Sequence, residues 1–338
     1  MAFVSLSIDL VGSTLAKQGI VTAAGDDMDK RNRYYREYLK LLFSIEREFY
    51  INVNQSFENA GLSMSRVSLV KSIGDEYWFA VDVDGDDDTD IATVAWSMIE
   101  SSMVSIGADR YLGIPTEDED SLDDETKAIL KTNFPIKVLV DIINDPTEIT
   151  TLRYQYLKDI FSILRQDSTT VFRVDDAFLA LCNRLNIGGS AVKASGESLV
   201  ARYDYIGLEI DRFFRLAKMA RPSILAIGDN LAQHLDCTVQ AHSEDLSDIG
   251  VKQMHIAPPA HIADAAMPIE ALVIQEAVPA EDMKGIGEGY VLHHLFTPEN
   301  LEPATFGQVH SALTLLAPSF SFLAENGYFL LNRDKGII

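Results

Sequence analysis

The sequence is poor in cysteine and in basic residues. Among 338 residues only Cys182 and Cys237 are cysteines, and no CxxC pair occurs. This scarcity argues against a disulfide framework or a structural zinc site and fits a reducing compartment. Lysine and arginine together number 28 against 51 aspartates and glutamates, a formal net charge of −23. Because such a field repels nucleic acid and anionic membrane surfaces, we expect neither as a partner.

Long apolar runs are also absent. None is long enough to span a bilayer, and the N-terminus lacks the basic and apolar segments of a secretory signal. We therefore expect a cytoplasmic protein. The length of 338 residues is enough for one large domain or two ordinary ones, and the hydrophobic content of 47% gives ample material for a core. Acidic residues gather at 82–90 and 117–125, most simply as solvated loops; the first resembles a calcium loop without its regular ligand spacing.

The most informative stretch is Val4–Thr14, VSLSIDLVGST. Its alternating residues predict a strand with one apolar and one polar face, ending at Asp9 before a turn at Gly12, Ser13 and Thr14. An acidic residue at a strand end can hold a divalent cation, and the free N–H groups of the turn can hold an anion. The same residue types also form ordinary turns and helix caps, so both interpretations stay open.

The segments that follow predict the first half of a sheet. Tyrosine and leucine residues at helical spacing predict a helix over 28–50. Two β-rich runs around Ile73-Gly74-Asp75 predict a hairpin over 65–81, with Asp75 at its tip. The remaining expectations are a loop over 16–27, a helix over 91–104, an acidic insertion over 105–134 and a buried strand over 135–142.

Residues 201–221 are the second informative stretch. A short strand is expected to end near Tyr205, and Gly207 to turn the chain into a helix that carries Asp211 and Arg215 one turn apart. Such a pair is also typical of an ordinary surface contact. Strands are further expected over 223–227, 271–277 and 290–295. This alternation without repeats predicts a single α+β domain with a mixed or antiparallel sheet covered by helices.

These pieces suggest one constellation. Asp9 ends a strand and Asp75 tips a hairpin, so two adjacent strands would let the carboxylates share two divalent cations. The turn after Asp9 would donate N–H groups to phosphate oxygens. Arg215 would stabilise the charge on a transferring phosphoryl group.

The ordered set of motifs resembles the class III nucleotide cyclases. The resemblance implies a ferredoxin-like, palm-type mixed sheet over residues 1–296, with insertions near 105–134 and 144–190 and a C-terminal extension over 297–338. The matching stretches are FVSLSIDLVGST at 3–14, KSIGD at 71–75, YDYIGLEIDRFFRL at 203–216 and MKGIGEGYVL at 283–292.

The resemblance assigns roles to individual residues. Asp9 and Asp75 correspond to the aspartates that bind two divalent cations, Mn²⁺ or Mg²⁺, in a metal site that includes Leu10. Arg215 corresponds to the transition-state arginine, and Asp211 stands where the family has a ribose-orienting asparagine. The base would be read by Lys71, Asp204 and Tyr205, and the phosphates would be bound by Gly12, Ser13, Thr14 and Lys284.

The same resemblance implies a homodimer with its active sites at the interface. One chain supplies the metal carboxylates and the other supplies the base-reading pair, the ribose-orienting residue and the arginine. In the family reaction the ribose 3′-hydroxyl attacks the α-phosphate, which closes a 3′,5′-cyclic nucleotide and releases pyrophosphate. Asp211 is a departure, because an ionised carboxylate accepts hydrogen bonds but donates none.

The base is left open by the sequence. Lys71 and Asp204 resemble an adenylate-type pair and suit adenine, cytosine or, with a shifted contact, uracil. The overall form resembles the pyrimidine cyclases of bacterial anti-phage (Pycsar) systems, which implies a UTP substrate ahead of CTP and a downstream cyclic-nucleotide effector. The alternatives are an adenylate cyclase, a non-catalytic regulatory homologue and a diguanylate cyclase, although the chain reads IGDEY where the last has GGDEF.

Two groups of residues near these motifs have a simpler interpretation. Tyr77, Trp78 and Tyr205 could shorten a base pocket or could be core residues. His293 and His294 are neighbours on an expected strand, so they point to opposite faces and are expected to be ordinary surface and sheet residues instead of sharing one metal ion.

Overall fold

The structure is a computed structural model that describes most of the chain up to residue 296. The structure describes residues 2–73, 75–83, 87–107, 136–144, 146–148, 193–195, 198–200, 205–221, 224–241, 251–264, 266–283, 286–287 and 289–296. The two predicted insertions and the C-terminal extension therefore lie almost entirely outside the described residues. Within this part of the chain, no helix is both long and apolar enough to cross a membrane.

The elements up to residue 144 alternate as a ferredoxin-like unit does. In chain order they are β1 (Ala2–Leu10), α1 (Ser13–Ala24), α2 (Met28–Ala60), η1 (Met64–Arg66), β2 (Val67–Ile73), β3 (Glu76–Val83), α3 (Asp88–Gly107) and β4 (Ile136–Asn144).

The later elements extend the same sheet. They are β5 (Thr147–Glu148), β6 (Lys193–Ser195), β7 (Ser198–Val200), β8 (Tyr205–Ile206), α7 (Leu208–Met219), β9 (Leu225–Gly228), α8 (Asp229–Ala232), β10 (Cys237–Ala241), β11 (Val251–Ile256), β12 (Ile269–Val278) and β13 (Tyr290–Phe296). The sequence does not predict β10 and β11.

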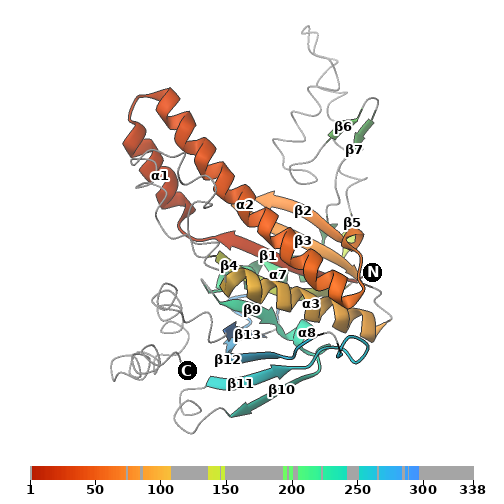
Figure 1. Ribbon diagram of the computed structural model, residues 1–338. Helices are drawn as coiled ribbons and strands as arrows, with labels where there is room; N and C mark the ends of the chain where they lie inside the picture. The colour runs from red at the N-terminus through yellow and green to blue at the C-terminus, as the bar shows by residue number, and fades with distance from the viewer. Residues whose placement is uncertain are drawn as a thin grey trace, which may run out of the picture.

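One nine-stranded sheet organises the molecule, in the order β10-β11-β12-β13-β9-β4-β1-β3-β2 (Figure 1). Within the group β4-β1-β3-β2 each pair of adjacent strands is antiparallel, which is the strand order of a βαββαβ ferredoxin-like fold. β4 and β9 are parallel, and β9 to β10 continue as an antiparallel run. The predicted α+β class with a mixed sheet is confirmed.

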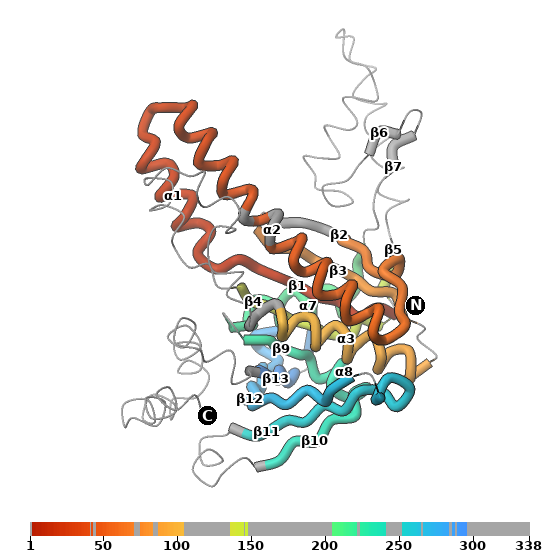
Figure 2. Tube along the Cα trace, in the orientation of Figure 1, coloured from red at the N-terminus to blue at the C-terminus, as the bar shows by residue number. Residues whose placement is uncertain are grey.

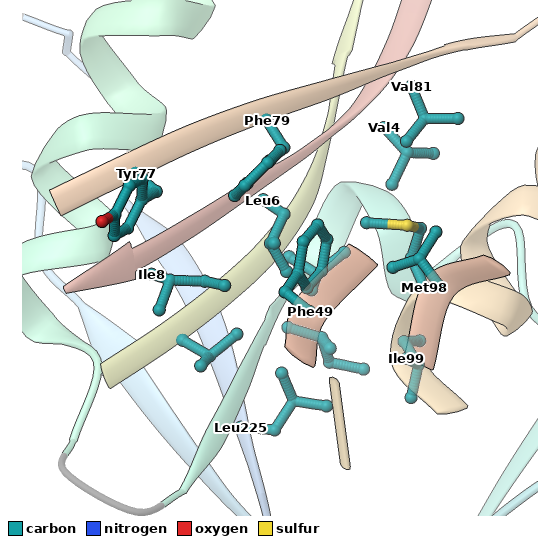
Figure 3. Close-up of a cluster of buried hydrophobic side chains, with 14 of the residues drawn as sticks. Val4, Leu6, Ile8, Phe49, Tyr77, Phe79, Val81, Met98, Ile99 and Leu225 are labelled. Atoms are coloured by element: carbon teal, nitrogen blue, oxygen red, sulfur yellow. The ribbon is translucent and has the colours of Figure 1, made fainter. Parts of the chain in front are cut away.

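Strand β1 lies at the centre of the core because its two faces differ as its sequence predicts. Val4, Leu6 and Ile8 are buried with residues of α2 and α3, such as Phe49 and Met98 (Figure 3). Burying side chains of this kind contributes about 1.5–3 kcal/mol each before conformational entropy is subtracted. The opposite face of β1 packs toward α7 and carries the polar residues of the candidate site.

Helices α1 and α2 form a hairpin that extends beyond the sheet (Figure 2). The loop expected over 16–27 is wrong, because helix α1 occupies most of it and buries Ala16, Ile20 and Ala24, four residues apart. Because two of these three residues are alanines, the apolar stripe of α1 is weak, and the sequence pattern did not reveal the helix. Helix α2 is preceded by a capping Asp27, whose carboxylate accepts from the Lys30 amide. It continues well past the predicted end to Ala60, where Gly61 in a left-handed conformation terminates it.

Candidate functional site

Asp9 lies at the end of β1, opposite Glu76 at the start of β3. Ser7 shares the face of Asp9, and its hydroxyl donates to the Glu76 carboxylate at 2.8 Å. Because cross-strand partners in an antiparallel pair share a face, the Asp9 and Glu76 carboxylates stand on the same side of the sheet. The pairing therefore concentrates negative charge where β1 ends.

The Asp9 carboxyl is held in an unfavourable place for a negative charge. Burial, and then the nearby charges of Glu76 and Asp75, raise its pKa to about 6, while Lys137 on β4 opposes the rise. A carboxylate destabilised by its neighbours in this way is one that a bound cation stabilises strongly. Because the charge of Asp75 raises the pKa of Asp9, the end of β1 and the hairpin tip lie close enough for their charges to interact.

Asp75 lies at the β2–β3 hairpin tip, as the sequence predicts. Its Oδ1 atom is 3.5 Å from the ammonium of Lys17 on α1. Lys17 Nζ is also 3.4 Å from the Ser13 hydroxyl, in the first turn of the same helix. The hairpin tip and the start of α1 therefore meet beside the end of β1.

The predicted phosphate-binding turn is the start of α1. Gly12 has φ 88° and ψ 2°, a left-handed conformation that glycine adopts without strain, and it precedes the helix directly. No side chain caps this end, so Ser13 and Thr14 open a helix whose first amides lack intrahelical partners. Together with the helix dipole these amides favour an anion.

The residues at this site fit divalent cations bound jointly by protein and substrate. Leu10 is buried in the apolar core, so it can act as a ligand only through its backbone oxygen. Among the residues that the structure describes, no group of three or more His, Cys, Asp or Glu side chains is arranged to hold a metal. Asp9 and Asp75 would therefore share ions with water and phosphate oxygens, as magnesium sites commonly do.

Helix α7 carries Asp211 and Arg215 on its outer side. Its buried positions are Ile210, Phe213, Leu216 and Ala217, whereas Leu208, Asp211 and Lys218 are exposed and Arg215 is partly exposed. Within the described ranges no hydrogen bond or ion pair joins Arg215 to Asp211, Asp9 or Asp75. Within one described chain, the predicted arginine and the predicted metal carboxylates are therefore not joined directly.

The orientation of α7 is fixed by polar contacts as well as by its apolar side. Glu209 accepts from the backbone amide of Asn144 at the end of β4 and pairs with Arg212 at 3.1 Å. The Arg212 guanidinium lies 4.9 Å from the centre of the Tyr290 ring. These contacts join α7 to two strands and favour the observed orientation of the helix.

A buried carboxylate, Asp141, continues this network into the sheet. Its oxygens accept from Tyr290 Oη at 2.9 Å and from the Leu231 amide at 3.1 Å. Burial raises its pKa to about 7, and the hydrogen bond from Tyr290 and the charge of Arg212 oppose the rise. The carboxyl also fills the space beside Gly228, where an added Cβ would lie 2.0 Å from Asp141 Cγ.

Several predicted residues are not located by the structure. Asp204 and Lys284 lie outside the described residues, and so does the side chain of Lys71, although β2 includes its backbone. Their proposed roles stay predictions.

Tyr205, predicted to contact the base, packs in the core of this structure. It is 6% exposed, and its ring lies 5.1 Å from that of Phe3. Tyr77 and Trp78 are buried too, the first donating to the Leu42 carbonyl. All three rings pack inside the chain, and the contact of Tyr205 with a base stays a prediction.

The expectation for His293 and His294 is wrong about exposure but right about direction. Both side chains are buried. Nε2 of His293 lies 3.2 Å from Oδ1 of Asp229, and Nε2 of His294 lies 2.8 Å from Oε2 of Glu276. Burial lowers the pKa of His294, and the Glu276 partner opposes that shift. The two rings have separate partners, as adjacent strand positions require.

The sequence reasoning missed Glu76, Lys17 and Asp141. The cross-strand register reveals Glu76, but only after β1 and β3 are paired. Lys17 lies four residues after Ser13, a spacing that has meaning only if the segment is helical. Asp141 is flanked on both sides by apolar residues of β4, at 138–140 and 142–143, and that interruption was the available signal.

Comparisons with known proteins add fold-level likeness only. The guanylyl cyclase Cya2 is 8% identical over 87% of this chain and 91% of its own, with a TM-score of 0.40. The guanylate cyclase domain of RhGC from Catenaria anguillulae in complex with GTP is 9% identical over 88% of this chain and 96% of its own, with a TM-score of 0.35. An adenylate cyclase from Trypanosoma brucei in its monomeric state is 11% identical over 87% of this chain and 89% of its own, with a TM-score of 0.31. No family model and no curated protein matches. At these values the likeness carries no argument about activity.

The Asp141 network predicts a pH-dependent stability. The ordinary pKa of the carboxyl is 3.8 and the folded value is about 7, so between these values the unfolded chain ionises first. The stability linked to this group is full below pH 4 and is lost as the pH rises through 7. Relative to Asp141→Asn, the wild-type free energy of unfolding should fall by about 2–4 kcal/mol between pH 4 and pH 8.

Urea unfolding at pH 4, 6 and 8 measures this difference, with Asp264→Asn at an exposed loop position as the matched control. The asparagine retains an oxygen for the Leu231 amide, so the fold should persist. A difference between wild type and Asp141→Asn that does not change with pH would contradict the interpretation.

Proposed function

We propose that the protein is a nucleotide cyclase that converts a ribonucleoside triphosphate to its 3′,5′-cyclic monophosphate and pyrophosphate. The observation that carries the proposal is the meeting of three features at one sheet edge. Asp9 ends β1, Asp75 tips the neighbouring hairpin, and the uncapped N-terminus of α1 begins beside them. Carboxylates for cations next to amides for an anion suit a metal–triphosphate complex.

Each residue has a defined task in this proposal. Asp9 and Asp75, with the Leu10 carbonyl, hold two divalent cations, Mn²⁺ or Mg²⁺. When bound, such ions activate the 3′-hydroxyl and neutralise the triphosphate. The amides from Gly12 to Thr14 hold phosphate oxygens and orient the chain. The 3′-hydroxyl would lose its proton to solvent as its oxygen bonds to the α-phosphorus, and pyrophosphate would leave with the electrons of the broken P–O bond.

The remaining groups are proposed to come from a second copy of the chain. Supporting this, Asp211 and Arg215 lie on the outer side of α7, and within the described part of the chain neither forms a hydrogen bond or ion pair with Asp9 or Asp75. In a homodimer the Arg215 of one chain would stabilise the phosphoryl charge at the carboxylates of the other. Lys71 and Asp204 would read the base, and Lys284 would reach the terminal phosphates.

For the substrate we propose a pyrimidine triphosphate, UTP ahead of CTP. Lys71 is a donor and Asp204 an acceptor, which suits O4 and N3–H of uracil or N3 and the amino group of cytosine. The product would act on a downstream effector in anti-phage defence. ATP fits the same donor and acceptor pattern, so an adenylate cyclase is the direct competitor.

A second candidate function, a non-catalytic nucleotide-binding homologue, is favoured by one observation. Asp211 is exposed on the same helix face as Arg215, at the position where the related enzymes have an asparagine. A carboxylate there donates no hydrogen bond to a ribose and weakens the positive field of the arginine. In this case the protein would bind nucleotide without turning it over.

A single assay separates these candidates. The protein is incubated with Mn²⁺ and each of the four ribonucleoside triphosphates in turn, and the product is identified by mass. We expect cyclic UMP, with Asp9→Ala and Asp75→Ala each lowering turnover by more than about 100-fold because the cations lose a ligand. Asp264→Ala, on an exposed loop, is the matched control.

The outcomes of this assay are distinct. Turnover of ATP alone would refute the pyrimidine assignment, and no product with any triphosphate would favour the non-catalytic homologue. Activity that survives Asp9→Ala or Asp75→Ala would refute the metal assignment.

Mixed dimers test the proposed sharing of the site between chains. Asp75→Ala and Arg215→Ala are each expected to be inactive alone, because every site then lacks one group. Mixed in equal amounts and exchanged, they should recover about one quarter of wild-type activity, since half of the dimers contain one complete site. Native mass spectrometry confirms the heterodimers, and inactivity despite their presence would contradict a shared site.

A further inference from the structure

Lys17 is a charged residue at the candidate site to which no motif assigns a task. It lies one turn into α1, and its ammonium is 3.5 Å from Asp75 Oδ1 and 3.4 Å from Ser13 Oγ. The same nitrogen lies 5.6 Å from the centre of the Tyr38 ring on α2. Three elements thus place one cation between the hairpin tip and the start of α1.

The pairing of Lys17 with Asp75 is loose. The two side chains are 37% and 20% exposed, and 3.5 Å is longer than the usual 2.7–2.9 Å of a charge-assisted hydrogen bond. An exposed pair of this kind adds little to stability. A lysine also has a flexible four-carbon stem and three donors, so its ammonium can change partners without any movement of the helix.

The alternative partner is an anion at the start of α1. Ser13, which Lys17 already contacts, belongs to the first helical turn, whose amides have no side-chain cap. Phosphate oxygens held by these amides would lie on the same side of the helix as the Lys17 ammonium, four residues further along. Asp75 would at the same time need its oxygens for a divalent cation.

We propose that Lys17 exchanges partners, leaving Asp75 when a divalent cation binds there and donating to terminal phosphate oxygens of the triphosphate. The proposal rests on the proposed function and adds a phosphate-binding residue to it. Without ligands the ammonium partly neutralises Asp75. With a cation on the carboxylates it is repelled toward the phosphates, so one residue links the binding of the metal to the binding of the triphosphate.

The exchange predicts two effects of opposite sign when the ammonium is removed. Lys17→Met should bind Mn²⁺ about 3-fold more tightly, because the ion no longer displaces an ammonium from Asp75. The same variant should bind a triphosphate roughly 10-fold more weakly at saturating Mn²⁺, because a charge-assisted hydrogen bond is lost. Methionine is a good helix former at this partly exposed position, so α1 should persist.

Isothermal titration calorimetry on the full chain measures both affinities. Mn²⁺ is titrated alone, and inorganic tripolyphosphate is then titrated at saturating Mn²⁺, so that neither base identity nor turnover matters. Lys17→Arg should retain most of the tripolyphosphate affinity. Lys30→Met is the matched control, since the Lys30 ammonium lies 5.6 Å from the centre of the Tyr34 ring at the start of α2; it should change neither affinity.

The results separate this proposal from the proposed function. If Lys17→Met binds tripolyphosphate as wild type does, or binds both ligands more weakly, the exchange is refuted while the metal site stands. If wild-type protein binds neither Mn²⁺ nor tripolyphosphate, the proposed function fails, and the exchange fails with it. Tighter Mn²⁺ and weaker tripolyphosphate binding in Lys17→Met alone support it.

Discussion

The antiparallel register between β1 and β3 is the constraint on which the candidate site depends. Asp9 pairs with Glu76, so the hairpin tip that carries Asp75 must lie beside the end of β1. A shift of one residue would turn Leu6 and Ile8 out of the core and Asp9 into it. The apolar face of β1 therefore fixes the position of the carboxylates, and the stability of the core maintains the site.

A second constraint acts on α7, on the other face of the sheet from α2 and α3. Phe213 and Leu216 anchor the helix, and Arg212 over the Tyr290 ring links it to the Asp141 network. Burying a carboxylate costs free energy of desolvation. Removing one partner of such a network destabilises the fold more than retaining the whole network does, because the other partner is then buried without compensation. Asp211 and Arg215 lie on the side of the helix away from its buried residues, where the proposed second chain would meet them.

The sequence predicted those parts that depend on local pattern. Alternation placed Asp9 at the end of a strand, and the Gly-Asp turn placed Asp75 at a hairpin tip. Helix α1 was missed because its buried residues, such as Ala16 and Ala24, are too small to give a strong stripe. Glu76 and Lys17 depend on contacts between distant segments, which no local pattern contains. The burial of Tyr205 follows from the packing of Phe3 and Trp78 around it, which is likewise a tertiary effect.

The central claim is that Asp9 and Asp75 together bind divalent cations beside the start of α1. The most direct measurement is anomalous X-ray scattering from crystals of the protein grown with Mn²⁺ and a non-hydrolysable analogue of UTP. The account predicts manganese peaks within coordination distance of both carboxylates, with phosphate oxygens against the Gly12–Thr14 amides. Manganese bound elsewhere, or no manganese at either carboxylate while the nucleotide is present, would contradict it.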